Sequence, residues 1–302
     1  MQDDRVDHNR KKHPCPDCTF CQWCSDDRCR LCRGGHSCRG RKLSLAEQVA
    51  LYDEINRRSG SHTPGTSRDR IESLDLTILQ PEDGYRFSVD PLLLCRFATP
   101  GDGDRVIDLG TGCGVIPLVS ARLNETATFV GVERQPLLAR LARENVVLNR
   151  LEGRIEIVEG DILELKGRFP VSSFDLVVAN PPYRKQGSGR QSPVKGRDEA
   201  RHESTATLAD FLAMAKYLVS PSGRICMIHL AERLPEFLAA AEGMKMAVTR
   251  LRMVHGTIDA PARMVLFEVV KGRGAQTVVL PPLIIREEGG AYAGECSWLA
   301  LR

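Results

Sequence analysis

The chain has 302 residues, enough for one large domain with a small appendage, and its mild net charge of +3 does not by itself indicate a partner. No stretch approaches the roughly 18 apolar residues of a membrane-spanning helix, and the polar N-terminus lacks the apolar centre of a secretory signal. Composition therefore predicts a soluble, cytoplasmic protein.

A cysteine-rich segment opens the chain, since seven of the eleven cysteines lie between residues 15 and 38. In a reducing compartment such crowding favours metal binding over disulfides, and paired Cys-x2-Cys segments typically form structural zinc sites. One or two zinc ions would supply the folding free energy that this segment, with few apolar residues, lacks. The predicted ligands are Cys15, Cys18, Cys21, Cys24, Cys29, Cys32, His36 and Cys38.

Two alternatives to zinc stay open for this segment. The first cysteines are spaced as in an iron–sulfur ferredoxin, although the spacing then departs from that pattern, and the segment can also hold no stable metal. Arginines between the cysteines can contact phosphate or simply face solvent. We expect an accessory module, at residues 1–42, that binds RNA or a partner.

The next segment joins this module to the main domain. Ser44 and Glu47 have the spacing of a capping box and precede apolar residues at helical intervals. Residues 61–70 have the composition of a linker. We therefore expect a helix and linker at residues 43–70 and the main domain at 71–302.

Strand and helix patterns alternate along the main domain. Strands are expected at residues 106–109, 127–133, 154–158, 174–179 and 224–230, helices at 115–123, 135–151, 208–218 and 231–242, and a last strand pair at 244–254 and 263–270. This order predicts an α/β fold with a doubly wound sheet and a C-terminal antiparallel strand pair.

A glycine turn follows the first of these strands. Gly110, Gly112 and Gly114 allow positive φ and close approach of a ligand to the backbone. A glycine turn also suits a nicotinamide cofactor, but its usual pattern is Gly-x-Gly-x-x-Gly. Here the carboxylate of Asp108 comes just before the turn, where it would repel a pyrophosphate and attract the ammonium of a methionine tail. The loop therefore favours S-adenosylmethionine (SAM) over NAD.

Acidic residues also end the next two strands. Glu133 lies 21 residues after Gly112 and is placed to accept hydrogen bonds from ribose hydroxyls. Asp161 follows the third strand and is placed to accept from the adenine amino group. One such residue is usually only a helix cap, but three at successive strand ends predict a site.

The strand at 174–179 runs into Asn180, Pro181, Pro182 and Tyr183. Prolines cannot continue a strand ladder, so Asn180 is expected at its carboxyl end, where α/β sheets bind ligands. The side-chain oxygen of Asn180 and the carbonyl of Pro181 can accept both hydrogens of a planar amino group, and Tyr183 can stack on a flat substrate. The pattern predicts methyl transfer to such a group, although Asn-Pro also commonly begins a turn.

The segment after Tyr183 is basic and rich in glycine. Residues 184–202 carry six Lys or Arg against two acidic residues. A basic, mobile loop beside the target pocket can grip phosphates, and a solvated surface loop is the alternative. We expect RNA, most simply tRNA, to bind here.

These residues together resemble a known family, the class I SAM-dependent methyltransferases with their Rossmann-like sheet. More narrowly, the chain resembles the bacterial tRNA adenine-N6 methyltransferases that modify adenine 37, beside the anticodon of a valine tRNA. The similarity covers about residues 70–295 and rests on the glycine turn and on four further segments, residues 79–90, 180–183, 200–203 and 263–266.

The resemblance implies roles for single residues. Asp108, Gly110, Gly112 and Gly114 would hold the methionine tail, Glu133 the ribose and Asp161 the adenine. It further implies that Arg86 and Phe87 close over the cofactor, and that Asn180, next to the cofactor, holds the target base together with Pro181 and Tyr183.

The cysteine-rich extension departs from the well-known members and leaves the RNA substrate open. Methylation of a guanine N2 in ribosomal RNA or of a release-factor glutamine is one alternative. A catalytically silent SAM-binding scaffold is another.

Overall fold

The computed structural model describes residues 65–82, 86–183, 206–272, 274–287 and 289–299. The chain divides into two units, residues 1–61 and 62–302, and all described residues belong to the second. The cysteine-rich module, the helix predicted after Ser44 and the basic segment 184–202 lie outside the described residues.

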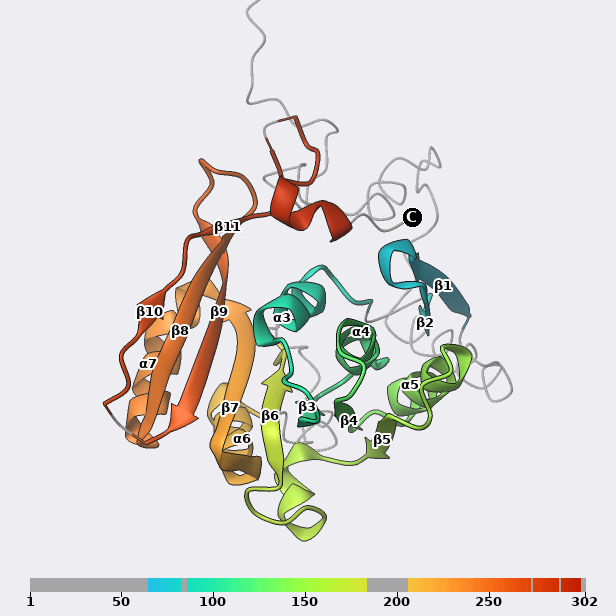
Figure 1. Cartoon of the computed structure of the whole chain (residues 1–302), viewed down its shortest axis with the longest axis horizontal. Helices are drawn as coiled ribbons and strands as arrows, with labels where there is room; N and C mark the ends of the chain where they lie inside the picture. The colour runs from blue at the N-terminus through green and yellow to red at the C-terminus, as the bar shows by residue number, and fades with distance from the viewer. Residues whose placement is uncertain (1–64, 83–85, 184–205, 273, 288, 300–302) are drawn as a thin grey trace, which may run out of the picture. The chain divides into compact units, whose positions relative to one another are not determined.

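A mixed sheet forms the centre of the described unit, in the order β10-β8-β9-β7-β6-β3-β4-β5, with β11 also paired to β8 (Figure 1). Its strands are β3 (Arg105–Leu109), β4 (Thr128–Glu133), β5 (Ile155–Glu159), β6 (Phe174–Ala179), β7 (Val219–Leu230), β8 (Met246–His255), β9 (Ala262–Lys271), β10 (Val278–Val279) and β11 (Leu283–Ile284). The strands from β3 to β7 pair in parallel, whereas β9 runs antiparallel to β7 and β8. The carboxyl ends of β3 to β8 therefore share one edge, and so does the turn from β8 to β9.

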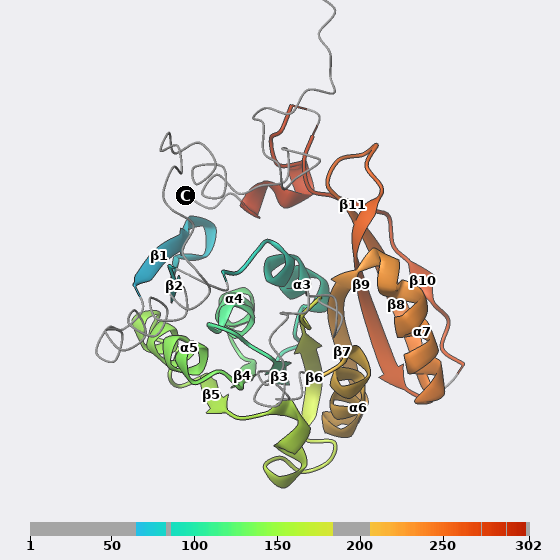
Figure 2. The same cartoon turned by 180° about the vertical axis from the view of Figure 1, so that it is seen from behind.

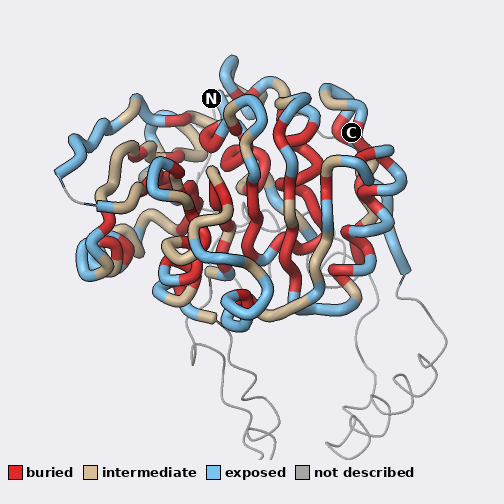
Figure 3. Tube along the Cα trace, turned by 60° about the horizontal axis from the view of Figure 1, so that its bottom comes forward, coloured by how far each residue is buried: buried red, intermediate tan, exposed pale blue. Residues whose placement is uncertain are grey.

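Helices cover both faces of this sheet, as the two opposite views show (Figures 1 and 2). On one face lie α3 (Asp90–Ala98), α4 (Val115–Leu123) and α5 (Pro136–Leu148), and on the other α6 (Leu208–Leu218) and α7 (Leu234–Gly243). Each face has its own cluster of buried apolar side chains, and Figure 3 shows the buried residues concentrated along the strands. None of the helices in the described ranges is long and apolar enough to cross a membrane.

The predicted α/β order is confirmed. Helices α4 and α6 and strand β6 have the predicted bounds, and β8 and β9 form the expected antiparallel pair. The helix expected at 231–242 begins as a short 3-10 turn and becomes α-helical only at Leu234, because Pro235 sits most easily in the first turn of a helix.

One part of the predicted linker proved wrong. Residues 66–70 belong to β1 (Thr66–Ile71), which pairs antiparallel with β2 (Leu76–Pro81). The polar side chains of β1 face outward while β2 is largely buried, so pairing with an apolar strand orders a segment whose own composition is that of a loop.

Two asparagines, Asn145 in α5 and Asn149 at its C-terminal cap, hydrogen-bond this hairpin to the domain. Asn145 accepts from the Leu79 N–H at 2.7 Å and donates to the Leu79 carbonyl at 2.9 Å. One helical turn later, Asn149 makes the same pair of bonds with Thr77, at 2.9 and 2.7 Å. Residues four apart share a helix face. The two side-chain amides therefore supply the donors and acceptors that a neighbouring strand would otherwise provide along β2.

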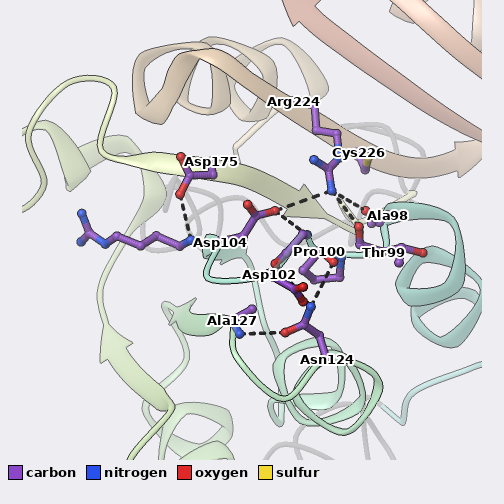
Figure 4. Close-up of polar contacts among 12 residues, drawn as sticks. Ala98, Thr99, Pro100, Asp102, Asp104, Asn124, Ala127, Asp175, Arg224 and Cys226 are labelled. Carbon is purple, nitrogen blue, oxygen red and sulfur yellow. Dashed lines mark hydrogen bonds and ion pairs between the residues drawn. The ribbon is translucent and has the colours of Figure 1, made fainter.

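An arginine closes the opposite, amino-terminal edge of the sheet (Figure 4). Arg224 of β7 donates to the carbonyls of Ala98 and Thr99 at 3.2 and 2.7 Å and lies 3.7 Å from a carboxylate oxygen of Asp104. It thereby satisfies carbonyls at the end of α3 that the helix itself leaves free. Thr99 has a φ of 20°, so these bonds also hold a strained connection into β3.

Candidate active site

The predicted site residues meet at the carboxyl edge of the sheet. Gly110 follows β3, Glu133 ends β4, Asp161 follows β5 by two residues and Asn180 follows β6. Because these strands are parallel neighbours, their carboxyl ends lie side by side at one edge of the sheet. Open α/β sheets bind their ligands at this edge. A cavity of about 250 Å³ lies here, lined by Gly110, Gly112, Val132, Glu133, Arg134, Gln135, Leu138, Asp161, Ile162, Asn180, Pro182, Ala206 and Phe211.

The glycine turn has the backbone geometry that the sequence predicts. Gly110, Gly112 and Gly114 have φ values of 78°, 59° and 85°, a region that favours glycine. A Cβ on Gly114 would lie 3.3 Å from the Cβ of Ala142 on α5. Glycine at this position therefore allows both the turn and the close packing of α4 on α5.

Asp108 lies directly behind this turn. Its side chain is 1% exposed, and neither carboxylate oxygen has a hydrogen-bond partner among the residues that the structure describes. Burial raises the pKa of Asp108 from 3.8 to about 7, and the nearby charge of Glu133 adds to the effect. A buried carboxylate without a partner costs free energy, so the site is arranged to receive a positively charged or donating group.

Glu133 ties the end of β4 to the glycine turn. Its two carboxylate oxygens accept from the backbone N–H groups of Gly112 and Gln135, at 2.9 and 2.8 Å. A carboxylate has about four acceptor positions, so Glu133 keeps capacity for hydroxyl donors while its orientation is fixed.

Asp161 caps a short 3-10 helix, Ile162–Gly167, by accepting from the Leu163 N–H at 2.9 Å. Its side chain also lines the cavity. The capping role and the predicted ligand role are compatible, because the capping bond uses one oxygen and the second can accept from a ligand.

Asn180 and Tyr183 are in direct contact. The Tyr183 hydroxyl lies 2.7 Å from the Asn180 side-chain oxygen and 3.0 Å from a carboxylate oxygen of Asp90, at the start of α3. Tyr183 is not among the residues that line the cavity, whereas Asn180 and Pro182 are, and Pro181 between them is buried. Stacking of Tyr183 on a substrate stays a prediction.

His229 packs against the ring of Tyr183 in an edge-to-face arrangement, with ring centroids 5.3 Å apart. Its Nδ1 accepts from the Leu230 N–H at 2.8 Å, so its proton is on Nε2, which is buried and has no hydrogen-bond partner within the described ranges. Burial, aided by the charge of Arg233, lowers the pKa of His229 to about 4. His229 is therefore neutral near pH 7.

Arg86 and Phe87, expected to close over the cofactor, lie in different surroundings. Arg86 forms an ion pair with Asp69 of β1, at 2.9 Å, and does not line the main cavity. Phe87 lines a smaller cavity of about 20 Å³ that shares Gly110 and Asn180 with the main one. Gln80 holds both, since it accepts from the Phe87 N–H at 3.1 Å and donates to Asp69.

Reasoning from the sequence missed Asp90, Phe211 and His229 at this site. His229 comes near the end of a predicted strand, and the rule that singled out Asn180 would have found it. Asp90 stands within the segment 79–90 that carries the family resemblance, but its contact with Tyr183 spans 93 residues and leaves no local pattern.

The predicted metal ligands all lie in residues 15–38, outside the described residues. Within the ranges that the structure describes, no group of three or more His, Cys, Asp or Glu side chains is arranged to hold a metal ion. The four cysteines there, Cys95, Cys113, Cys226 and Cys296, are buried and unpaired.

Comparison with known structures supports the fold. A predicted O-methyltransferase from Agrobacterium tumefaciens aligns with a TM-score of 0.56 and 24% identity, over 68% of this chain and 92% of that protein. At this identity the similarity concerns the fold alone.

Comparison of sequences gives the family. The model of the methyltransferase small domain matches residues 90–254. A tRNA1(Val) (adenine(37)-N6)-methyltransferase from Porphyromonas gingivalis is 33% identical over 63% of this chain and 75% of its own length. An enzyme of the same name from Pasteurella multocida is 31% identical over 68% of this chain and 84% of its own length. The chain therefore belongs to the methyltransferase small domain family and is a SAM-dependent methyltransferase.

Proposed function

We propose that this protein methylates N6 of an adenine in tRNA, at position 37 of a valine tRNA. The names of the relatives support this substrate. The observation that carries the chemistry is the position of Asn180 and Pro181, which follow β6 directly. Asn180 lines the same cavity as Gly110, Glu133 and Asp161 from the ends of β3, β4 and β5.

The residues that line the cavity or lie directly behind it fit SAM. The buried Asp108 carboxylate, behind the glycine turn, has no hydrogen-bond partner among the described residues and suits the ammonium of the methionine tail. Glu133 keeps acceptor capacity for the ribose hydroxyls, and Asp161 has a second oxygen for the adenine amino group. Phe87, beside Gly110, covers the methionine end, whereas Arg86 acts through the β1–β2 hairpin.

Catalysis then needs little acid–base chemistry from the protein, because the nitrogen becomes acidic once it is methylated and loses its extra proton to solvent after the transfer. When bound, SAM supplies an electrophilic methyl group. The amino group of adenine is a poor nucleophile because its lone pair is delocalised into the ring. The Asn180 side-chain oxygen and the Pro181 carbonyl accept its two hydrogens and favour a tetrahedral nitrogen, since fixed acceptors stabilise the charge that develops there.

We also propose that residues 184–202 grip the RNA backbone and that residues 1–42 hold zinc and assist RNA binding. Deletion of residues 1–42 is expected to weaken RNA affinity and to flatten its salt dependence, because fewer phosphates are then neutralised. Unchanged affinity and slope would remove the module from RNA binding. Metal analysis of the full chain, purified without chelators, tests zinc directly.

Transfer of labelled methyl groups to total tRNA, ribosomal RNA and release factor tests the main proposal. N6-methyladenosine in tRNA, identified by nucleoside mass spectrometry, is the expected product. Asn180→Ala is expected to lower transfer by about a thousandfold and to leave SAM affinity nearly unchanged. Asp175→Asn serves as control, because Asp175 accepts from Arg105 N–H at the far end of β6. Label found only in ribosomal RNA or in release factor would overturn the proposed substrate.

A further inference from the structure

The hydroxyl of Tyr183 has one proton and lies within hydrogen-bond distance of two acceptors from other described residues. It lies 2.7 Å from the Asn180 oxygen and 3.0 Å from an Asp90 carboxylate oxygen. A phenol hydroxyl can donate to only one of them at a time. His229 packs on the ring of Tyr183, so the proton can change its acceptor by rotation about the C–O bond while the ring stays in place.

The choice of acceptor matters because of what Asn180 must do. Its side-chain oxygen is the proposed acceptor for a hydrogen of the target amino group. A hydroxyl that already donates to this oxygen draws on the same lone-pair density and weakens the acceptor for a second donor. The oxygen is at full strength only when Tyr183 donates elsewhere.

Asp90 provides the alternative acceptor. A carboxylate accepts a stronger hydrogen bond than a neutral amide. Asp90 is the first residue of α3, and its negative charge there is favoured by the helix dipole. Its backbone N–H donates to the Ser88 hydroxyl at 3.2 Å, which helps to fix the start of the helix.

We propose that Asp90 is a positioning residue for methyl transfer, which takes the Tyr183 proton and so leaves the Asn180 oxygen free for the target amine. This inference rests on the proposed function, because that function assigns the Asn180 oxygen to the amine. Asp90 is not among the residues that line the cavity and acts through its contact with Tyr183.

The test is a double-mutant cycle between Asp90 and Tyr183. Asp90→Asn keeps the shape but offers only a neutral acceptor, so kcat is expected to fall about fivefold to tenfold, the difference between a charged and a neutral hydrogen bond. SAM affinity is expected to stay the same. Tyr183→Phe removes the hydroxyl, and in that background Asp90→Asn should have no further effect on kcat.

Two results would overturn the proposal. One is an equal loss of kcat from Asp90→Asn in both backgrounds, which indicates a role independent of Tyr183. The other is a loss of SAM affinity, which places Asp90 in the cofactor site. Asp90→Ala tests the same interaction without any acceptor, and Asp175→Asn controls for the loss of an acidic group elsewhere.

A spectroscopic readout separates this proposal from the function on which it rests. In the free protein, the NMR signals of the Asn180 side-chain amide should shift in Asp90→Asn and should not shift further when this change is added to Tyr183→Phe. This holds even if tRNA proves not to be the substrate. If no methylated adenine is formed but the NMR signals shift as expected, only the proposed function is contradicted. If the Asn180 signals do not change in Asp90→Asn, the positioning role is contradicted.

Discussion

Asn145 hydrogen-bonds both the N–H and the C=O of Leu79, and it also donates to the carbonyl of Cys113 at 2.9 Å. A single buried amide thus joins the β1–β2 hairpin, which holds Phe87 through Gln80, to the glycine turn of the cofactor site. Asn149 binds the same hairpin, at Thr77, but not the turn.

Replacing each asparagine by leucine separates these two tasks. Both changes leave buried backbone groups of β2 unpaired and should lower the free energy of unfolding by about 2 to 4 kcal/mol. Only Asn145→Leu should also weaken SAM affinity, by about tenfold for the one lost bond to the turn. Denaturant unfolding and calorimetric SAM titration measure the two effects. Equal SAM affinity in both variants would show that the turn does not depend on Asn145.

The unpartnered carboxylate of Asp108 predicts a proton-linked cofactor affinity. Its pKa of about 7 in the free protein means that part of the population must lose a proton before an ammonium group can pair with it. SAM affinity should therefore fall as pH decreases from 7 to 6. In Asp108→Asn, affinity should be weaker by about thirtyfold or more and should lose this part of the pH dependence. Calorimetry at several pH values provides the measurement.

Asp108 also affects stability, with the opposite sign to an ordinary carboxylate. Its pKa is raised on folding, so the native state binds more protons than the unfolded state between pH 3.8 and 7. The penalty for ionising this buried group is therefore absent well below pH 3.8 and reaches about 4 kcal/mol above pH 7. Asp108→Asn should gain stability over the wild type as pH rises from 4 to 8. A constant difference across this range would contradict the raised pKa.

His229 gives a second pH effect. Because its pKa is lowered from 6.5 to about 4, the unfolded state takes up a proton that the native state does not. The stability that neutral His229 contributes is present above pH 6.5 and is lost as pH falls toward 4. His229→Phe keeps an aromatic ring against Tyr183. In this variant, the free energy of unfolding should decrease less as pH falls from 6.5 to 4. Thermal unfolding followed from pH 7 to 4 shows whether it does.

Glu268 lies in β9, away from the site, and a change there tests whether the stability of the sheet affects SAM binding. It accepts from Arg250 at 2.6 Å and from Thr249 at 2.8 Å, and although burial alone would raise its pKa, these bonds keep the pKa below 4.5. Glu268→Gln should cost about 3 kcal/mol at pH 7, less as pH falls below 4.5, with SAM affinity unchanged. A loss of SAM affinity would show that the two regions are coupled.

Much of this fold could be predicted from local pattern. β6 and α6 carry apolar runs with clear boundaries, and Glu133, Asp161 and Asn180 could be placed together because parallel strands bring their ends to one edge. The strand β1 could not be predicted, since its polar residues are ordered by pairing with β2. The contact between Asp90 and Tyr183 likewise depends on how α3 lies against the end of β6, which no spacing in the sequence records.

The reversed direction of β9 has a consequence for how such enzymes diversify. Because β9 runs against both of its neighbours, the chain turns back between His255 and Ala262 on the same side as Asn180. Residues inserted into that turn would extend toward an incoming macromolecule without moving any strand register or any core side chain. Insertions in this turn could therefore change substrate specificity without changing the residues that carry out methyl transfer.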